Sequence, residues 1–557
     1  MRQTSCAWRR LRKHLSSAVH PTVIAAVMLV FTQARAENYI ATSGDAAWGD
    51  STQWLEGTVP NAVGAAAILP SPTGTRTIEL GGPGAECPET GCNFTIGSLN
   101  FTNDSAVTST IRNDSQNEAV GSLIFDASGS GPVMITASGT GTQQTLVLAT
   151  MVFNDTVDVN TTTTKGNGTA GLLSLTGDIT GPGGLTKDGL GTMTMAFISG
   201  FSSGSKSYQG PTVVNQGTLR LSQGGTPNMT SSVTVNSGGQ LLLITGATSP
   251  NTGIYTFGTS SDTLLTLNGT GPATAPGAIR VVTANTPPVT VTNLISLAGS
   301  TAFNVNGATN ILDLTNKISG NGSLIAGALG GTGDTGTLQL DGANDYSGGT
   351  TVDLGTLSLS NANARLGTGN VTVDGTTTGA AGRLIIHSGV LNAIADAATL
   401  TLTGGGIAGT ADKGYVELDA NDTVSGLVLG GIAKAAGTYG SSSSAATFKD
   451  DEYFTGSGVL TVLPSGVPGD YNGNGVVDAA DYVLWRNGGP LQNEVVSSGT
   501  VDAADYDAWR ARFGNTSGSG SALVHGSNVP EPLAASLLAI AALCSVAVGR
   551  QRVDENE

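Results

Sequence analysis

Residues 208–222 read YQGPTVVNQGTLRLS, and residues 346–360 read YSGGTTVDLGTLSLS. The two stretches share Tyr, Thr, Val, Gly and two Leu at the same offsets. Within Thr-Leu-x-Leu, apolar and polar residues alternate, which is the period of a strand with one buried face. The chain therefore contains a duplicated block of half-buried strands.

The similarity extends outward to residues 179–222 and 318–360, and a Val-Thr-Val strand follows each copy at 233–235 and 371–373. Short strands recur about every 20 residues between Gly and Asn, as a stacked β-coil requires. Such a coil buries its apolar side only against its neighbours, and Gly allows positive φ at the corners. We expect an all-β solenoid over residues 93–463.

The composition agrees with many short strands joined by tight turns. Of 557 residues, 81 are Gly, 12% are charged and 39% are hydrophobic, which argues against a disordered chain. Lys and Arg number 24 against 41 Asp and Glu, a net charge of −17. Nucleic-acid binding depends on Lys and Arg neutralising phosphates, so we expect no nucleic-acid partner.

The first copy carries a Gly- and Lys-containing signature, GGLTKDGLGTM at residues 183–193. It resembles the autotransporter-associated β-strand repeat, in which this signature precedes the Tyr-to-Leu stretch. The second copy has Ile325 and Ala326 where the Lys would fall. The resemblance implies a right-handed parallel β-helix.

The sequences at the two ends of the expected solenoid differ from the repeats between them. Trp48 and Trp54 are either a carbohydrate-stacking pair or packing that caps the first coil. We expect a cap, within an N-terminal cap region over residues 37–92, because terminal coils need covering. Residues 437–462 are expected to close the array, and residues 463–466 (Leu-Pro-Ser-Gly) mark a linker.

The first 36 residues have the organisation of a signal peptide. Five basic residues up to Lys13 precede an apolar run at 22–31, and Ala34 and Ala36 supply the small residues of a cleavage site. We expect cleavage before Glu37 and export.

The C-terminal residues 529–557 follow a Ser/Gly linker at 516–528 and contain Pro530, Glu531 and Pro532 before an apolar run at 533–548 and two Arg. This order resembles the PEP-CTERM sorting tail of Gram-negative bacteria. The resemblance implies a C-terminal hydrophobic helix, transient anchoring in the inner membrane and an exosortase-type sorting enzyme as partner. The alternative is an ordinary membrane anchor. Contact with a membrane is expected only through this tail.

Two cysteines outside the targeting segments, Cys87 and Cys92, lie in C-P-E-T-G-C. The intervening Pro and Gly can form a tight loop, so an oxidising compartment would favour a local disulfide. The alternative is two free thiols. We expect the disulfide.

Residues 470–481 read DYNGNGVVDAAD. Oxygen-bearing side chains occupy loop positions 1, 3, 5, 9 and 12, with Gly475 at position 6; these are Asp470, Asn472, Asn474, Asp478 and Asp481. The Val476 carbonyl would add a ligand at position 7. Calcium takes six to eight oxygens from such a loop. We therefore predict a Ca²⁺ site, the alternative being an acidic turn.

The loop ending in Asp, followed by residues 482–486, resembles a dockerin type I domain. The resemblance implies a small α-helical, EF-hand-type module over residues 466–515. A second copy at 499–510 places Glu494, Val496 and Ser498 at positions 1, 3 and 5, so its site is expected to be weak or absent. Cohesin-like partners contact positions 10 and 11, and Ala at both in each copy argues against such a partner.

No catalytic set is evident. His387 is the single His between the targeting segment and the C-terminal linker and follows an apolar strand, where a structural role is expected rather than that of a base. Glu417 and Asp419 share a strand face, either as a glycosidase pair or as a solvated face, and we expect the latter.

We therefore expect a non-catalytic surface or extracellular-matrix scaffold or adhesin. The alternative is a β-helix that binds or degrades an extracellular polysaccharide. A cluster of acidic and basic side chains along one groove would favour this alternative, whereas a smooth Thr/Ser/Asn surface would favour the scaffold.

The export signals make a direct prediction. The mature protein should begin at Glu37 and end near residues 530–532, because both end segments are removed. Intact-mass spectrometry of protein from the cell surface or medium checks this. A retained segment 533–557 would instead indicate a plain membrane anchor.

Overall fold

The computed structural model describes most of the chain between Ala36 and Asn515. The described residues are 36–81, 92–113, 121–128, 131–141, 145–162, 173–196, 206–222, 231–244, 253–258, 260–282, 288–327, 335–375, 382–463, 466–494 and 500–515. Contacts divide them into two compact units, one ending at Leu463 and one beginning after it. We call the first the solenoid and the second the helical unit.

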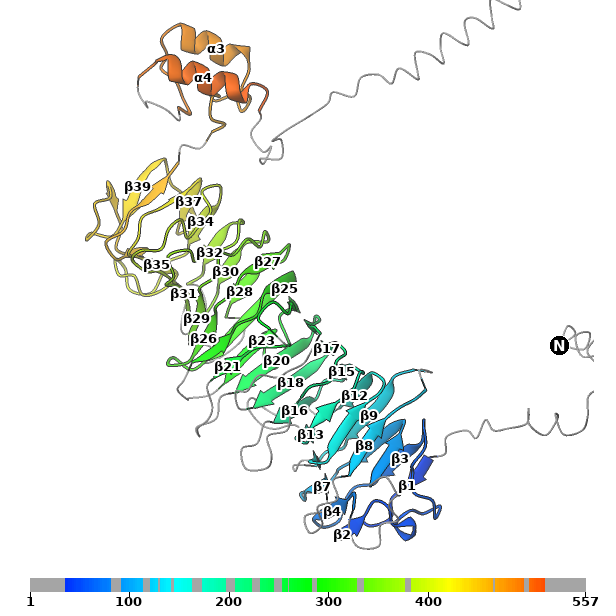
Figure 1. The fold of residues 1–557 in the computed structure, drawn as a ribbon. Coiled ribbons are helices and arrows are strands. Elements are labelled where there is room, and N and C mark those ends of the chain that lie inside the picture. The colour runs from blue at the N-terminus through cyan, green and yellow to red at the C-terminus, as the bar shows by residue number, and fades with distance from the viewer. Residues whose placement is uncertain are drawn as a thin grey trace, which may run out of the picture. The chain divides into compact units, whose positions relative to one another are not determined.

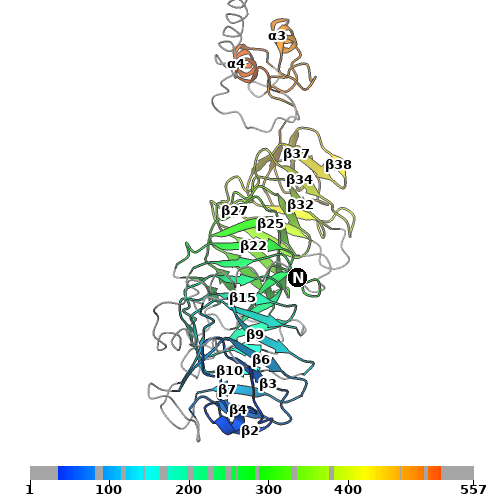
Figure 2. The same cartoon turned by 90° about the vertical axis from the view of Figure 1, so that its right-hand side faces the viewer.

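The solenoid is a stack of coils built from parallel strands (Figures 1 and 2). Two ladders run side by side through its first half and meet at β25 (Ile295–Asn306). The first contains β1 (Ala36–Asn38), β3 (Ala66–Leu69), β6 (Ser98–Thr102), β9 (Val133–Ser138), β12 (Val157–Thr161), β15 (Leu185–Asp188), β17 (Thr212–Val214), β19 (Val233–Val235) and β22 (Leu265–Gly269). The second contains β2 (Gly44–Ala47), β4 (Arg76–Glu79), β7 (Ser109–Arg112), β10 (Thr145–Val147), β13 (Leu173–Leu175), β16 (Thr192–Ala196), β18 (Gly217–Ser222), β20 (Gly239–Ile244) and β23 (Ile279–Val282).

The same large sheet continues beyond β25, and two smaller parallel sheets complete the coils. The continuation comprises β27 (Ile318–Gly320), β28 (Leu324–Ala326), β30 (Thr350–Val352), β32 (Val371–Val373), β34 (Thr399–Leu402), β37 (Gly426–Leu429) and β38 (Ile432–Ala433). One smaller sheet holds β5 (Asn93–Ile96), β8 (Ser122–Phe125), β11 (Thr150–Phe153) and β14 (Ile179–Thr180). The other holds β21 (Ile254–Tyr255), β24 (Val289–Val291), β26 (Ile311–Leu314), β29 (Thr337–Leu340), β31 (Thr356–Leu359), β33 (Arg383–Ile386), β35 (Tyr415–Leu418) and β41 (Phe454–Thr455).

This architecture confirms the expected β-rich fold with parallel sheets of the β-helix type. In β31, Leu357 and Leu359 are fully buried, and both align with leucines of β29 below. Coil length varies, since Thr212 pairs with Val233 and Val233 in turn with Leu265. The expected spacing of about 20 residues therefore describes only the shortest coils, and longer coils carry their extra residues outside the ladders.

The recurring Tyr and Thr of the duplicated block form a buried hydrogen bond in both copies. Tyr208 Oη lies 2.5 Å from Thr212 Oγ1, and Tyr346 Oη lies 2.7 Å from Thr350 Oγ1. All four residues are at most 3% exposed, so each hydroxyl needs the other as a partner. The recurring Gly adopts φ 67° at Gly217 and 71° at the equivalent Gly355, as expected for a corner.

The two copies occupy different faces of the solenoid. The Thr-Leu-x-Leu strand of the first copy, β18, belongs to the large sheet, whereas its equivalent β31 belongs to the eight-stranded sheet. The sequence repeat therefore does not coincide with the geometric repeat of the coil.

Lys187 closes a corner of the first copy. Its side chain is fully buried, and Nζ donates to the carbonyls of Asp188 at 2.8 Å, Gly189 at 2.8 Å and Gln216 at 3.2 Å. Burial lowers the pKa of this amine to about 7. In the second copy Ala326 is the equivalent residue, and it lines a small apolar space beside Phe303 and Leu338.

Aromatic side chains close the N-terminal end. Trp48 and Trp54 are 0% and 2% exposed, their rings lie 5.1 Å apart, and Trp54 Nε1 donates to the Trp48 carbonyl at 2.8 Å. Tyr39 packs on Trp54 and Phe94 on Trp48. Their burial leaves no ring face for a sugar, so the pair acts as a cap. A short 3₁₀ helix, η1 (Ser51–Gln53), precedes Trp54.

A four-stranded sheet closes the other end. It contains β36 (Asp422–Val424), β42 (Leu460–Val462), β39 (Gly437–Gly440) and β40 (Phe448–Lys449). Here β39 pairs antiparallel with β42, which breaks the parallel pattern and ends the stack. Asp422 is 5% exposed and accepts hydrogen bonds from the backbone N–H groups of Ile394 and Thr423.

The buried carboxyl of Asp422 predicts a pH-dependent stability. Burial raises its pKa from 3.8 to about 6, so the native state holds this proton more tightly than the unfolded state. As the pH rises from about 4 to about 6, the free energy of unfolding of the wild type should therefore fall by up to about 3 kcal/mol more than that of Asp422→Asn. Denaturant unfolding of both proteins across this range checks it. The exposed control Asp262→Asn should follow the wild type, and parallel pH profiles for wild type and Asp422→Asn would contradict the assignment.

Candidate functional site

The helical unit is organised by two helices with the same start. Helix α3 (Ala479–Arg486) has Asp478 as N-cap, and α4 (Ala503–Arg512) has Asp502. In each helix the Asp three residues later, Asp481 or Asp505, accepts from the N-cap backbone N–H and completes a capping box. The repeated V-D-A-A-D sequence thus fixes both helix starts.

The predicted calcium loop folds around two buried carboxylates. Asp470 and Asp481 are 2% and 0% exposed. Asp470 accepts from the backbone N–H of Asn474 at 3.1 Å and of Gly475 at 2.8 Å, and Asp481 Oδ1 accepts from the N–H of Asn472 at 2.9 Å. These bonds join the first and last residues of the loop to its middle.

Two amide side chains bend the loop between these ends. Asn472 Oδ1 accepts from the Asn474 N–H and Asn474 Oδ1 from the Val476 N–H, both at 2.9 Å. Such Asx turns hold the amide oxygens on the inner side of the bend. Gly475 has φ 87°, as the sharp turn requires.

The donor set at this loop fits calcium better than a softer metal. The described part of the chain contains no group of three or more His, Cys, Asp or Glu side chains arranged to hold a metal ion. A cation here would therefore need amide and carbonyl oxygens as well as carboxylates, which calcium accepts and zinc does not favour. Asp470, Asn472, Asn474, Val476, Asp478 and Asp481 would supply them.

The second loop is described only at its edges. Glu494, Asp502 and Asp505 are described, whereas residues 495–499, which include Val496 and Ser498, lie outside the described residues. Asp505 is fully buried. Its Oδ2 accepts from the Asp502 N–H, and its Oδ1 has no hydrogen-bond partner among the described residues. That the second loop lacks a full ligand set stays a prediction.

The two helices are tied together by reciprocal hydrogen bonds that sequence reasoning missed. Trp485 Nε1 donates to the Asp502 carbonyl at 2.7 Å, and Trp509 Nε1 donates to the Asp478 carbonyl at 2.8 Å. Tyr482 and Tyr506 pack against both indoles, with ring centroids 5.0 to 5.7 Å apart. The repeated Y-x-x-W was the signal that could have revealed this pairing.

The remaining predicted residues are only partly described. Cys92 is disulfide-bonded, while Cys87 lies outside the described residues, so the pairing of these two residues stays a prediction. Ala36 begins β1, and Ala34, Pro530, Glu531 and Pro532 also lie outside. No helix of the described ranges is both long and apolar enough to cross a membrane.

The candidate catalytic residues of the solenoid are engaged in structural contacts. His387 Nε2 lies 3.2 Å from Ser358 Oγ, and Ser358 is only 4% exposed. No carboxylate contacts the imidazole within the described part of the chain. Glu417 forms an ion pair with Arg383, which leaves it poorly placed as half of a carboxylate pair.

The comparisons with known proteins agree with the repeats. The model of the passenger-associated-transport-repeat family matches residues 185–221 and 333–363. These matches coincide with β15 to β18 and with β29 to β31. No curated protein matches significantly, and no solved structure does.

The reciprocal tryptophan bonds make a paired prediction. Trp509→Phe should speed amide exchange in α3 by about fivefold, because loss of one neutral hydrogen bond costs about 1 kcal/mol. Trp485→Phe should have the mirrored effect on α4. Hydrogen-exchange mass spectrometry of the full chain measures both, with the exposed Val483→Ala as control. Equal loosening of both helices by either substitution would contradict the reciprocal arrangement.

Proposed function

We propose that this protein is an exported, passenger-like structural protein of the cell surface or extracellular matrix, acting as a scaffold or adhesin. Passenger-associated transport repeats indicate an exported protein, and the chain carries two of them. The proposal rests on the stack of parallel coils that the described residues of the solenoid form before its closing sheet, a form suited to holding surface groups at fixed spacing.

The surface of the stack suits a structural role. The outward position is Thr in several strands, as in β19, β24 and β32, whose valines are buried. Charged residues make up only 12% of the chain, which limits repulsion between neighbouring coils. The His387 and Glu417 contacts described above provide no nucleophile and base in an open cleft. We therefore infer a non-catalytic protein.

Sorting after export belongs to the same proposal. The signal peptide at 1–36 and the tail at 529–557 would direct the chain through the inner membrane to an exosortase-type enzyme. Mass analysis of the mature termini tests this step separately from the fold.

We also propose that the helical unit binds one Ca²⁺ through the loop at 470–481. In the described residues, the buried carboxylates of Asp470 and Asp481 have no cationic side chain within ion-pair distance. Carboxylates that share one loop would repel one another when no cation is bound. A bound cation would remove this repulsion and stiffen the starts of α3 and α4. Exported proteins meet millimolar calcium, so a modest affinity is sufficient.

The calcium proposal predicts a loss on substitution. Titration calorimetry of the full chain should detect one site with a dissociation constant on the order of 10⁻⁴ M or tighter. Asp470→Ala with Asp481→Ala should abolish the heat, whereas the solenoid should retain its hydrogen-exchange protection because it is a separate compact unit.

Asp507→Asn is the matched control, since Asp507 is an exposed carboxylate of α4 outside the loop. It should bind calcium as the wild type does. No heat at millimolar calcium would overturn the site, and two equivalent sites would show that the second loop also binds.

The second candidate function is binding of an extracellular polysaccharide. A β-helix that binds an extracellular polysaccharide would be expected to carry acidic and basic side chains along one groove. Acidic and basic side chains lie close together in the second half of the solenoid, where Lys317 pairs with Asp345 and where Asp345, Arg365 and Asp396 line one cleft.

A further inference from the structure

One face of the solenoid changes character after β27. Beyond Ile318–Gly320, the described residues of the next three coils form no regular strand there, and short irregular turns at residues 343–348, 364–369 and 391–397 take its place, with one parallel bridge between Ala343 and Arg365. The turns remain stacked: Asp345 N donates to the Ile318 carbonyl at 3.0 Å, Thr368 N to Tyr346 at 2.8 Å, and Leu366 N to Ala393 at 2.8 Å. The three turns therefore belong to consecutive coils.

These turns line a cleft of about 350 Å³. Leu366, Gly367, Ala395 and Ala397 provide apolar lining. The polar lining residues are Asn344, Asp345, Arg365, Thr368, Asn392 and Asp396. Coils stack about 4.8 Å apart, so a cleft across three coils extends about 10 Å along the axis.

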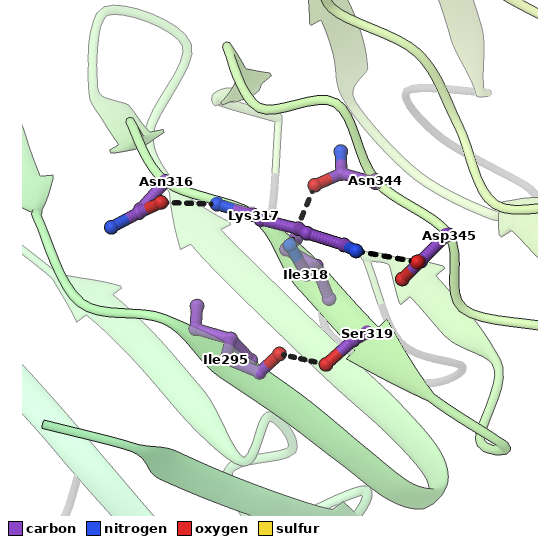
Figure 3. A network of polar contacts seen from close by, with 7 residues as sticks. All are labelled: Ile295, Asn316, Lys317, Ile318, Ser319, Asn344 and Asp345. Atoms are coloured by element: carbon purple, nitrogen blue, oxygen red, sulfur yellow. Dashed lines mark hydrogen bonds and ion pairs between the residues drawn. The ribbon is translucent and has the colours of Figure 1, made fainter. Parts of the chain in front are cut away.

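Two of the lining residues, Asn344 and Asp345, belong to the network of polar contacts drawn in Figure 3. Buried Asn344 accepts from the Ile318 N–H at 2.7 Å and donates to the Arg365 carbonyl at 2.8 Å, so it joins three coils. Asp345 Oδ2 lies 2.5 Å from Lys317 Nζ. The charge of Asp345 is therefore already matched by a side chain of the preceding coil.

Arg365 and Asp396, the next two charged residues along this face, do not form an ion pair with each other. Lys317, Asp345, Arg365 and Asp396 follow on successive coils with alternating sign. In the described part of the chain, neither Arg365 nor Asp396 has an ion-pair partner. The side-chain amide of Asn392 lies 3.1 Å from Asp396 Oδ1 and donates to it in the amide orientation that satisfies both groups.

The chemistry of these residues defines the ligand. A guanidinium only donates hydrogen bonds and a carboxylate only accepts them. A hydroxyl does both, so neighbouring hydroxyls on one ring would serve Arg365 and Asp396 together, with Thr368 and Asn392 adding adaptable contacts. The apolar floor would cover the C–H face of the ring. A cleft of this volume lies at the lower end of the range for small-molecule sites, about 300–1,000 Å³.

We propose that this cleft binds a saccharide segment of an extracellular polysaccharide, laid along the solenoid axis. Arg365 and Asp396 are the specificity-determining residues. The site does not depend on calcium binding or on the sorting tail, and it involves binding without cleavage.

The test uses the full chain and short oligosaccharides of cellulose, mannan and polygalacturonate as probes. Titration calorimetry should find binding to at least one of them. Arg365→Gln and Asp396→Asn should each weaken that binding about tenfold or more, as expected when a charged hydrogen-bond partner is lost. Arg383→Gln is the matched control, since Arg383 lies on β33 and pairs with Glu417 outside the cleft; it should bind as the wild type does.

Circular dichroism and thermal unfolding establish that each variant is folded. Failure of all three oligosaccharides to bind, or unchanged binding by Arg365→Gln and Asp396→Asn, would overturn the proposal. Binding of a zwitterionic amino acid such as glycine at this cleft, in place of a sugar, would overturn it as well. None of these outcomes affects the calcium or export proposals, which have separate measurements.

Discussion

The structure depends on one constraint: a coil of a β-solenoid buries its apolar side chains only against the coils above and below it. Each inward residue therefore belongs to a column, such as Leu338, Leu357 and Leu384, and the column fixes the register of every strand it crosses. Slipping a strand by one residue would turn its apolar side outward. At the ends of the described stack, Trp48 and Trp54 cover one end, and a four-stranded sheet containing the antiparallel pair β39–β42 covers the other.

The same constraint leaves the corners free to vary. A coil can gain residues wherever their side chains do not enter a column of buried residues. Val233 therefore pairs with Thr212, 21 residues earlier in the chain, and with Leu265, 32 residues later. Polar and charged side chains lie at these corners. Lys187 donates to three carbonyls at one corner. Three turns that replace strands form the cleft beside Arg365.

The elements that could be predicted from the sequence are those whose pattern lies within a few consecutive residues. Period-two alternation identified the strands of both repeat copies, and the loop at 470–481 together with α3 followed from local spacing. The shift of the second copy to another face was not predictable, because it depends on the summed lengths of the intervening coils. The indole bonds of Trp485 and Trp509 were missed although the repeated Y-x-x-W was visible, since their acceptors are backbone carbonyls of the other helix.

The two candidate binding sites differ for the same reason. A calcium loop concentrates its ligands in twelve consecutive residues, so its sequence pattern is sufficient to suggest the ion. The cleft takes about one charged residue from each coil, at Lys317, Asp345, Arg365 and Asp396, and no sequence window shows them together. In a solenoid, residues that lie next to each other along the stacking axis are a whole coil apart in the sequence. A site built from them can therefore be recognised only when it is known which residues of successive coils stack on one another.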